Sequence, residues 1–285
     1  MLQMTIREFA PAKINLTLHV TGQRSDGYHL IDSLVAFADI GDWVTVEKST
    51  EMHFAVRGPR AKGVPTDDSN LVLRAAGLML TDQGTSVTLE KHLPAASGIG
   101  GGSADAAATL RAIRRLCNQP IPSAADMLSL GADVPVCLES ETARMQGIGE
   151  ILTPIAALPA VWVVLVNPGV EISTPRSFKA LASKENAPMP ETIPVFEDIG
   201  GMVAWLSEQR NDLQPGAIAM EPVIGDVLAA IATTKKLVLT RMSGSGATCF
   251  GLYATEEDAS ASAQTICTRH PEWWVAAGVL RSCVS

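Results

Sequence analysis

The segment richest in glycine is also the one whose residue types and spacing best fit ligand binding. Four of the five residues at 98–102 are glycine, within the run PAASGIGGGSA at 94–104. Glycines let backbone N–H groups converge on an anion, and a following helix adds unpaired amides and the positive end of its dipole. The segment therefore predicts a phosphate cradle. A strand-to-helix turn that needs glycine only for packing is the structural alternative.

Two common phosphate-binding motifs do not describe this loop. No lysine follows the glycines, as a Walker loop requires, and Gly98, Gly100 and Ser103 miss the spacing G-x-G-x-x-G. A second glycine segment, Ser243-Gly244-Ser245-Gly246, follows Met242 between two predicted strands. Gly-Ser alternation there is as typical of a plain hairpin as of a ligand loop.

Lys13 and Asn15 share the polar side of a segment that alternates over 12–20. Alternation predicts a half-buried strand whose polar side ordinarily meets solvent. Asp133 follows Gly131 at the end of a predicted helix. A lysine on a strand and an aspartate in a turn are common, so each residue taken alone favours a structural role over a catalytic one.

Three aromatic or imidazole side chains are candidates for holding a flat ring. The turn Asp26-Gly27 delivers Tyr28 and His29 to a loop, and Phe178 follows Thr174-Pro175. Such residues bind a ring or pack into the core.

Composition limits the classes of protein to consider. The chain has 285 residues, 47% of them hydrophobic, and its 22 basic and 30 acidic residues give a net charge of −8. This composition predicts a globular protein of two domains, and its acidity disfavours general nucleic-acid binding. The five cysteines are odd in number and never form C-x-x-C, which predicts neither a disulfide framework nor a zinc site. With no signal peptide and no apolar run long enough to span a bilayer, we expect a cytoplasmic protein without a membrane partner.

The elements that must position these residues follow an α+β pattern, with a surface loop at 184–194 and a domain boundary before the apolar run 161–166. On the helix after the glycine loop, Arg111, Arg114 and Arg115 are expected to face solvent. The expected strands are 12–20, 86–90, 134–136, 161–166, 237–241, 247–253 and a closing run 273–280. The expected helices are 104–117, 124–130 capped by Ser123 and Asp126, two near Met202 and Ile224, and one capped by Thr255 and Asp258.

Four motifs in this order resemble the GHMP small-molecule kinases: PAKINL at 11–16, the glycine loop, GADVP at 131–135 and MSGSG at 242–246. Within that family, TGQRSDGYH at 21–29 and NPGV at 167–170 resemble the members that phosphorylate the 2-hydroxyl of a methylerythritol carrying a cytidine diphosphate group, in the non-mevalonate route to isoprenoids. The loop departs from the family at Ala95-Ala96-Ser97, where some members carry more glycines, and at Ile99, where leucine is commoner.

The resemblance implies a fold of two domains, an N-terminal ribosomal-protein-like α/β domain over 1–157 and a C-terminal ferredoxin-like α+β domain over 158–285. It implies ATP as co-substrate and a Mg²⁺ ion whose ligands are unknown, with Ser103 as a candidate. We expect a monomer or homodimer.

The resemblance also implies roles for single residues. Lys13 and Asp133 would be catalytic, Asp133 as the base, while Asn15, Tyr28, His29 and Phe178 would bind the substrate. The residues that would hold the ATP phosphates are Pro94, Ala95, Ala96, Ser97, Gly98, Ile99, Gly100, Gly101, Gly102, Ser103 and Ala104.

Two other functions remain alternatives. The same loop and aspartate would serve a GHMP kinase with a smaller acceptor, such as homoserine or a mevalonate derivative, although the Tyr28-His29 loop argues against it. A non-catalytic RNA-binding module is suggested by the implied N-terminal fold and opposed by the charge of −8.

Overall fold

The computed structural model describes residues 5–79 and 84–281. It divides into two compact units that interleave along the chain. The first takes Met1–Ala12, Gly41–Ala95 and Gly100–Ser140, and the second takes Lys13–Ile40, Ala96–Ile99 and Glu141–Ser285. These units are not consecutive halves of the sequence, and the domain boundary at 157/158 stays a prediction.

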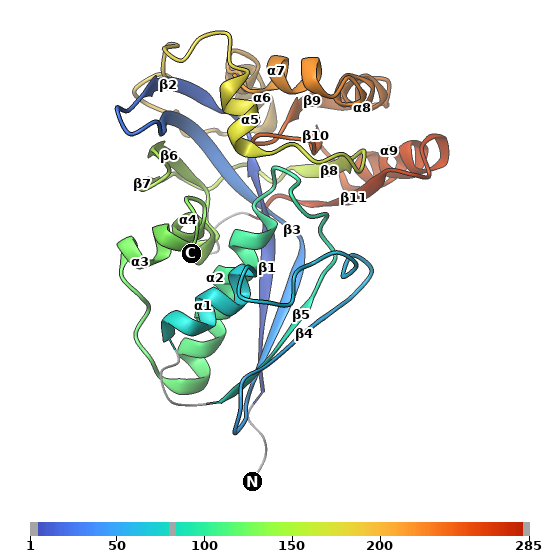
Figure 1. Ribbon diagram of the computed structural model, residues 1–285. Helices are drawn as coiled ribbons and strands as arrows, with labels where there is room; N and C mark the ends of the chain where they lie inside the picture. Colours follow the sequence, from blue (N-terminus) through green and yellow to red (C-terminus); the bar gives the residue numbers. More distant parts are fainter. Residues whose placement is uncertain (1–4, 80–83, 282–285) are drawn as a thin grey trace. The chain divides into compact units, whose positions relative to one another are not determined.

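The first unit packs helices against strands. Strand β5 (Thr85–Glu90) pairs in parallel with β4 (His53–Arg57) and antiparallel with the C-terminal half of the long strand β3 (His29–Lys48). Helix α1 (Leu71–Met79) packs along α2 (Gly101–Cys117), as Figure 1 shows. The buried face of α2 is rich in alanine, which allows this close approach. Helices α3 (Ala124–Leu130) and α4 (Val134–Glu139) complete the unit.

The second unit contains a four-stranded antiparallel sheet in the order β11-β8-β10-β9. Its strand β8 (Trp162–Asn167) lies between two neighbours and is buried from Val163 onward, as its unbroken apolar run predicts. The remaining strands are β9 (Leu237–Met242), β10 (Cys249–Tyr253) and β11 (Trp274–Val279), and the helices are α5 (Thr174–Lys179), α6 (Ile199–Ser207), α7 (Gln214–Met220), α8 (Val223–Ala232) and α9 (Glu256–Arg269). Helix α8 packs on β9 and β10, and α9 packs on β8 and β11.

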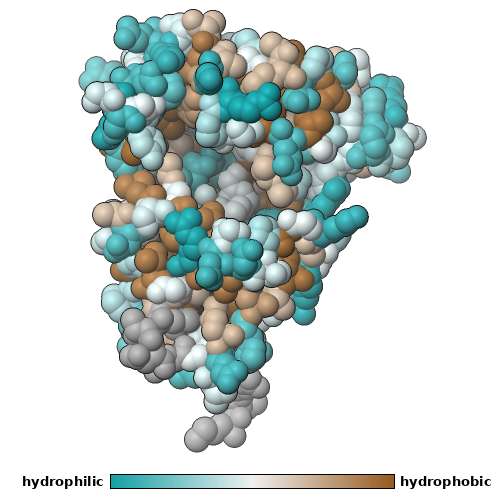
Figure 2. All heavy atoms as spheres, viewed as in Figure 1, coloured by the Kyte–Doolittle hydropathy of each residue, from teal (hydrophilic) through white to brown (hydrophobic). Residues whose placement is uncertain are grey.

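The second unit also holds the strands around the N-terminal half of β3. There β3 pairs with β2 (His19–Gln23) and with β6 (Ala143–Gly147), which in turn pairs with β7 (Ile151–Pro154). Strand β1 (Thr5–Asn15) begins in the first unit and ends in the second. Hydrophilic residues cover much of the surface over β2 in Figure 2. Tyr28, in the turn after β2, is aromatic and 60% exposed.

Several predicted elements are confirmed. Helix α3 spans the predicted residues, and Ser123 and Asp126 form its capping box. Thr255 caps α9 by accepting a hydrogen bond from the Asp258 backbone. The loop at 184–194 contains no helix or strand. Local capping signals and breaks in periodicity were sufficient for these elements.

Three predictions are wrong. The Val-Pro-Val segment begins helix α4, because Pro135 lies in the first turn, where its missing N–H is not needed. The polar side of the first strand is buried, with Lys13 4% and Asn15 1% exposed, and the strand ends at Asn15. Arg111 is not simply solvated, since its guanidinium donates to the carbonyl oxygens of Phe9, Cys137 and Leu138.

Among residues 5–79 and 84–281, no helix has the length and apolarity needed to cross a membrane. Cys283 lies outside the described residues.

Candidate functional site

Three motifs far apart in the sequence meet within the second unit. The Ser243 hydroxyl donates to the Gly98 carbonyl at 3.0 Å and accepts from the Asn15 backbone N–H at 3.0 Å. The Lys13 N–H donates to the Ile99 carbonyl at 2.9 Å. The end of β1, the middle of the first glycine loop and the start of the second glycine loop are therefore joined by hydrogen bonds.

Glycine is required where the two glycine loops touch. A Cβ on Gly98 would lie 2.6 Å from the Ser243 carbonyl oxygen and 2.7 Å from the Gly246 nitrogen. A Cβ on Gly244 would lie 2.5 Å from the Gly98 carbonyl oxygen. Both glycines also have positive φ, +75° and +55°. The second glycine loop is thus a packing partner of the first, beyond its role as a hairpin.

The side chains of Lys13 and Asn15 form a buried polar chain. The Lys13 ammonium donates to Asn15 Oδ1 at 2.7 Å, and Asn15 Nδ2 donates to the Ser33 hydroxyl at 2.8 Å. These contacts hold the Asn15 amide in one orientation and fix the Lys13 ammonium beside it. Sequence analysis singled out the lysine and asparagine but not Ser33.

The first unit supplies the helical end of the glycine loop. Gly100 is the N-cap of α2 with a left-handed φ of 65°, and the Ala104 N–H donates to its carbonyl. The amides of Gly101, Gly102 and Ser103 come before the first intrahelical bond, so this turn presents donors for an anion.

Asp133 and Ser103 are both associated with the Gly131 turn in the first unit. A Cβ on Gly131 would lie 3.6 Å from the Ser103 hydroxyl, and Asp133 follows two residues later as the N-cap of α4. The Asp133 side chain makes no capping hydrogen bond to that helix. Asp133 is half-buried.

The predicted aromatic residues assemble within the second unit. The rings of His29 and Phe178 stack with centroids 4.7 Å apart and planes 22° apart. Among the described residues, His29 Nε2 is buried without a hydrogen-bond partner, and burial lowers the pKa of this imidazole. Tyr28 is exposed next to it on the Asp26-Gly27 turn. The stacked pair, the polar edge of His29 and the exposed ring of Tyr28 beside it have the chemistry to hold a flat ring.

The family comparisons agree with these motifs. The model of the GHMP kinases N-terminal domain matches residues 70–143, and that of the GHMP kinases C-terminal domain matches residues 193–271. The 4-diphosphocytidyl-2-C-methyl-D-erythritol kinase of Cereibacter sphaeroides is 60% identical over 269 residues, which is 94% of this chain and 96% of that protein. The chain belongs to the 4-diphosphocytidyl-2-C-methyl-D-erythritol kinases, a family of GHMP kinases.

Further relatives support the same assignment. The kinase of the same name from Dinoroseobacter shibae is 56% identical over 276 residues, covering 97% of this chain and 95% of that protein. A crystal structure of 4-(cytidine 5'-diphospho)-2C-methyl-D-erythritol kinase superposes with a TM-score of 0.77 at 30% identity, covering 96% of this chain and 99% of that one. The predicted GHMP kinase fold is confirmed.

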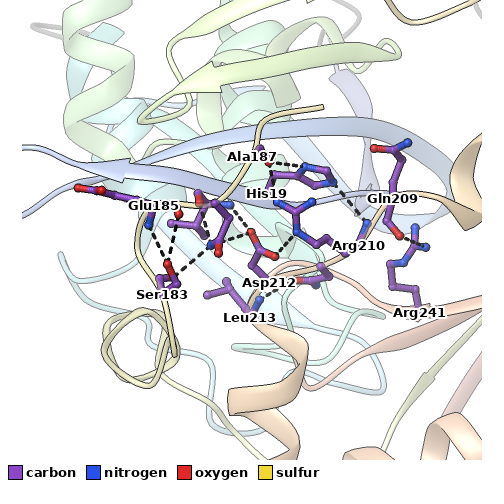
Figure 3. Close-up of polar contacts among 12 residues, drawn as sticks. His19, Ser183, Glu185, Ala187, Gln209, Arg210, Asp212, Leu213 and Arg241 are labelled. Atoms are coloured by element: carbon purple, nitrogen blue, oxygen red, sulfur yellow. Dashed lines mark hydrogen bonds and ion pairs between the residues drawn. The ribbon is translucent and has the colours of Figure 1, made fainter. Parts of the chain in front are cut away.

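A second polar cluster within this GHMP kinase was not found from the sequence. His19 Nδ1 lies 3.1 Å from the Ala187 carbonyl oxygen, and the Arg210 backbone N–H donates to Nε2 (Figure 3). The Asp212 carboxylate accepts from the Arg210 side chain at 2.6 Å and from the Val20 backbone at 2.7 Å. The cluster therefore holds the 184–194 loop against the start of β2, the strand that leads to Tyr28 and His29.

This arrangement requires His19 to be neutral. Its Nε2 accepts a hydrogen bond, and burial, followed by the nearby Arg210 charge, lowers the pKa of the imidazole. The His19 imidazole binds a proton more readily in the unfolded chain than in the folded protein. The stability that neutral His19 contributes is therefore complete above the unfolded pKa of about 6.5 and is lost as pH drops below it.

Between pH 7.5 and pH 5.5 we expect the wild type to lose stability relative to His19→Gln, because only the wild type loses the contribution of the neutral His19 imidazole. The matched control is His53→Gln, at an exposed position of β4, which should leave the pH dependence unchanged. Thermal melts at both pH values measure the difference. A pH dependence equal in the wild type and His19→Gln would contradict this role for His19.

Proposed function

We propose that the chain transfers the γ-phosphate of ATP to the 2-hydroxyl of 4-diphosphocytidyl-2-C-methyl-D-erythritol, giving the 2-phosphate in isoprenoid precursor synthesis. The observation that carries this proposal is the 60% identity to a kinase of that name over 94% of the chain. The motif residues named from the sequence supply the chemistry.

The ATP phosphates are assigned to the glycine loop, Pro94 to Ala104. The support is the run of amides at the start of α2 together with the absence of side chains at Gly100, Gly101 and Gly102. Positioned backbone donors stabilise the charge that develops on the transferred phosphoryl group without reorganising during the reaction. The second glycine loop, Ser243, Gly244, Ser245 and Gly246, would support the first through its contacts with Gly98.

Asp133 is assigned as the proton acceptor. An aspartate cannot deprotonate an alcohol in advance, because a carboxylate is a far weaker base than the alkoxide it would have to generate. In the loose transition state of phosphoryl transfer the hydroxyl becomes acidic only as the new P–O bond forms. A carboxylate that accepts the proton late is therefore sufficient.

Lys13 is assigned to attract the γ-phosphoryl oxygens during transfer. The Lys13 ammonium donates a hydrogen bond to Asn15, which holds it in position before ATP binds and avoids reorganisation during the reaction. Asn15 would bind near the substrate hydroxyl.

The residues present fit a Mg²⁺ ion that takes most of its ligands from the ATP phosphates and water rather than from the protein. Among the described residues no cluster of three His, Cys, Asp or Glu side chains forms a cage. Mg²⁺ usually keeps several waters and binds phosphate oxygens with one or two protein ligands, and the Ser103 hydroxyl is an oxygen donor of the right chemistry. When bound, the ion would neutralise charge on the phosphates.

Tyr28, His29 and Phe178 are assigned to the cytosine. Tyr28→Ala or Phe178→Ala should raise the KM for the cytidyl substrate by about 5- to 150-fold, equivalent to ~1–3 kcal/mol per stacked base, with KM for ATP kept within twofold. Steady-state kinetics with each substrate varied in turn measures this. A rise in KM for ATP instead would reverse the assignment.

The experiment that tests the function is a panel of acceptors in an ADP-release assay. We expect turnover with the cytidyl substrate and little with the same methylerythritol lacking the cytidyl group, homoserine or mevalonate derivatives. Faster turnover of a smaller acceptor would replace this function with that of another GHMP kinase. ATP-independent, salt-sensitive RNA retention without ADP release would favour the RNA-binding alternative.

The proposal includes the setting of the enzyme. We place it in the cytoplasm as a monomer or homodimer, without a nucleic-acid or membrane partner, consistent with its net charge of −8. Its functional halves would divide at 157/158, and each family model matches entirely on one side of this boundary.

A further inference from the structure

A buried lysine in the first unit joins two carboxylates. The Lys91 ammonium lies 2.5 Å from Asp42 Oδ2 and 2.7 Å from Asp105 Oδ2. The three residues are 4%, 0% and 2% exposed. Replacing buried ion pairs with apolar residues of similar size is often neutral or stabilising, so stability alone is a weak reason for this cluster.

The cluster holds both ends of the glycine loop. Asp42 Oδ1 accepts from the backbone N–H groups of His92, at 2.5 Å, and Leu93, at 2.8 Å, immediately before the loop. Asp105 lies near the start of α2, immediately after the loop. Lys91 connects the two carboxylates, so the residues that enter the loop and those that leave it share one anchor.

The anchor lies beside the amides that would bind phosphate. A Cβ on Gly101 would be 3.3 Å from the Lys91 ammonium nitrogen. Displacing α2 from Lys91 would therefore move the first turn, whose N–H directions determine how well an anion is bound. Small displacements matter in phosphoryl transfer, because a misplacement of about 1 Å lowers rates by up to ~10².

We propose that Lys91, Asp42 and Asp105 are positioning residues for ATP, which hold the two ends of the glycine loop at the spacing that phosphate binding requires. The inference rests on the assignment of that loop to the ATP phosphates. It adds residues outside the loop that determine the affinity for ATP and leave the acceptor site unchanged.

The test variant removes the ion pair between Lys91 and α2, and each buried charge that remains keeps a partner of opposite charge. Asp105→Leu removes one carboxylate, and Lys91 and Asp42 remain as a pair of net charge zero. We expect KM for ATP to rise about 10-fold and KM for the cytidyl substrate to stay within twofold. If Asp105→Leu does not fold, a triple variant, Lys91→Met with Asp42→Asn and Asp105→Leu, removes all three buried charges and the connection to α2, and the amide oxygen introduced at position 42 can still accept from the backbone N–H groups of His92 and Leu93.

A conservative variant separates positioning from charge. Burial raises the pKa of the Asp105 carboxyl to about 7, with Lys91 opposing the rise and Asp42 adding to it. Its other oxygen, Oδ1, has no hydrogen-bond partner among the described residues. A neutral group is therefore compatible with this position, and Asp105→Asn should keep KM for ATP within about threefold of the wild type. Val87→Ala, a buried truncation in β5, is the control for lost stability alone.

Each outcome separates this inference from the proposed function. Gly102→Ala, within the loop itself, tests the phosphate site independently. A raised KM for ATP in Gly102→Ala with an unchanged KM in Asp105→Leu would overturn the positioning role and leave the kinase assignment intact. An unchanged KM for ATP in both would remove the loop from ATP binding. The positioning role would also be overturned if Asp105→Leu raised KM for ATP and KM for the acceptor equally. The same conclusion would follow if Val87→Ala raised KM for ATP as much as Asp105→Leu does.

Discussion

Replacing Asp133 with asparagine should lower kcat by roughly 10² to 10⁴, with KM for ATP nearly unchanged, as expected when a positioned proton acceptor is lost. Asparagine keeps the size and an acceptor oxygen, but it does not take up a proton. Since Asp133 makes no capping hydrogen bond to α4, the substitution should not unfold that helix. Steady-state kinetics, with a thermal melt of each protein, measure both effects.

The matched control for this variant is Asp126→Asn in the same unit. Asp126 is an exposed carboxylate whose role is to cap α3, and asparagine retains an acceptor for that purpose. Its kcat should equal that of the wild type. Turnover by Asp133→Asn at the wild-type rate would remove Asp133 from the chemical step.

Two glycines of one loop should respond in opposite ways to the same added methyl group. Gly102→Ala has room, since its nearest contact would be Leu71 Cδ1 at 3.5 Å, and alanine favours a helix. We expect it to fold with unchanged or slightly higher stability. Gly102 is exposed in the first turn of α2, so a methyl group there would crowd a phosphate bound by the amides of that turn, and kcat/KM for ATP should fall about 10²-fold.

Gly98→Ala should instead fail through stability. Its methyl group would overlap the Ser243 carbonyl oxygen and the Gly246 backbone, and its φ is +75°. We expect a loss of several kcal/mol or no folded protein. Gly77→Ala in α1, where a Cβ would meet nothing within 4 Å, is the control that should gain stability without affecting ATP. Wild-type kinetics in Gly102→Ala would exclude this loop as the phosphate site.

The sequence predicted best those features that depend on neighbouring residues. Helix α3 begins and ends as predicted because Ser123, Asp126 and Gly131 act within a few residues of one another. The turn that presents Tyr28 was found from Asp26-Gly27 for the same reason. The Val-Pro-Val segment misled the prediction because β-branched residues favour strands, whereas Pro135 favours a first helical turn.

Contacts between distant segments were beyond such reasoning. Buried Asn15 is hydrogen-bonded to the hydroxyls of Ser33 and Ser243, and Ser243 lies 228 positions further along the chain. Nothing in the alternation of 12–20 distinguishes this strand from one facing solvent. The role of Gly98 likewise depends on the second glycine loop, so a glycine count could not separate a packing glycine from a phosphate-binding one.

The Lys91 cluster left a signal in the sequence that was not used. Strand β5 alternates between buried and half-buried residues from Thr85 to Glu90, and continuing that alternation puts Lys91 on the buried side. Asp105 shares a helical face with Thr109 and Ala112, which are also buried. A charged residue at a position that the periodicity of its strand or helix places in the core indicates a buried ion pair, because an unpaired buried charge is strongly unfavourable.

A crystal structure with a non-hydrolysable ATP analogue and the cytidyl substrate tests the central claim most directly. The proposed mechanism predicts that backbone amides of residues 98–103 bind the triphosphate and that the Asp133 carboxylate lies within hydrogen-bond distance of the substrate 2-hydroxyl, with the terminal phosphorus in line with that oxygen. A triphosphate bound away from the glycine loop, or a 2-hydroxyl without Asp133 as its neighbour, would contradict it.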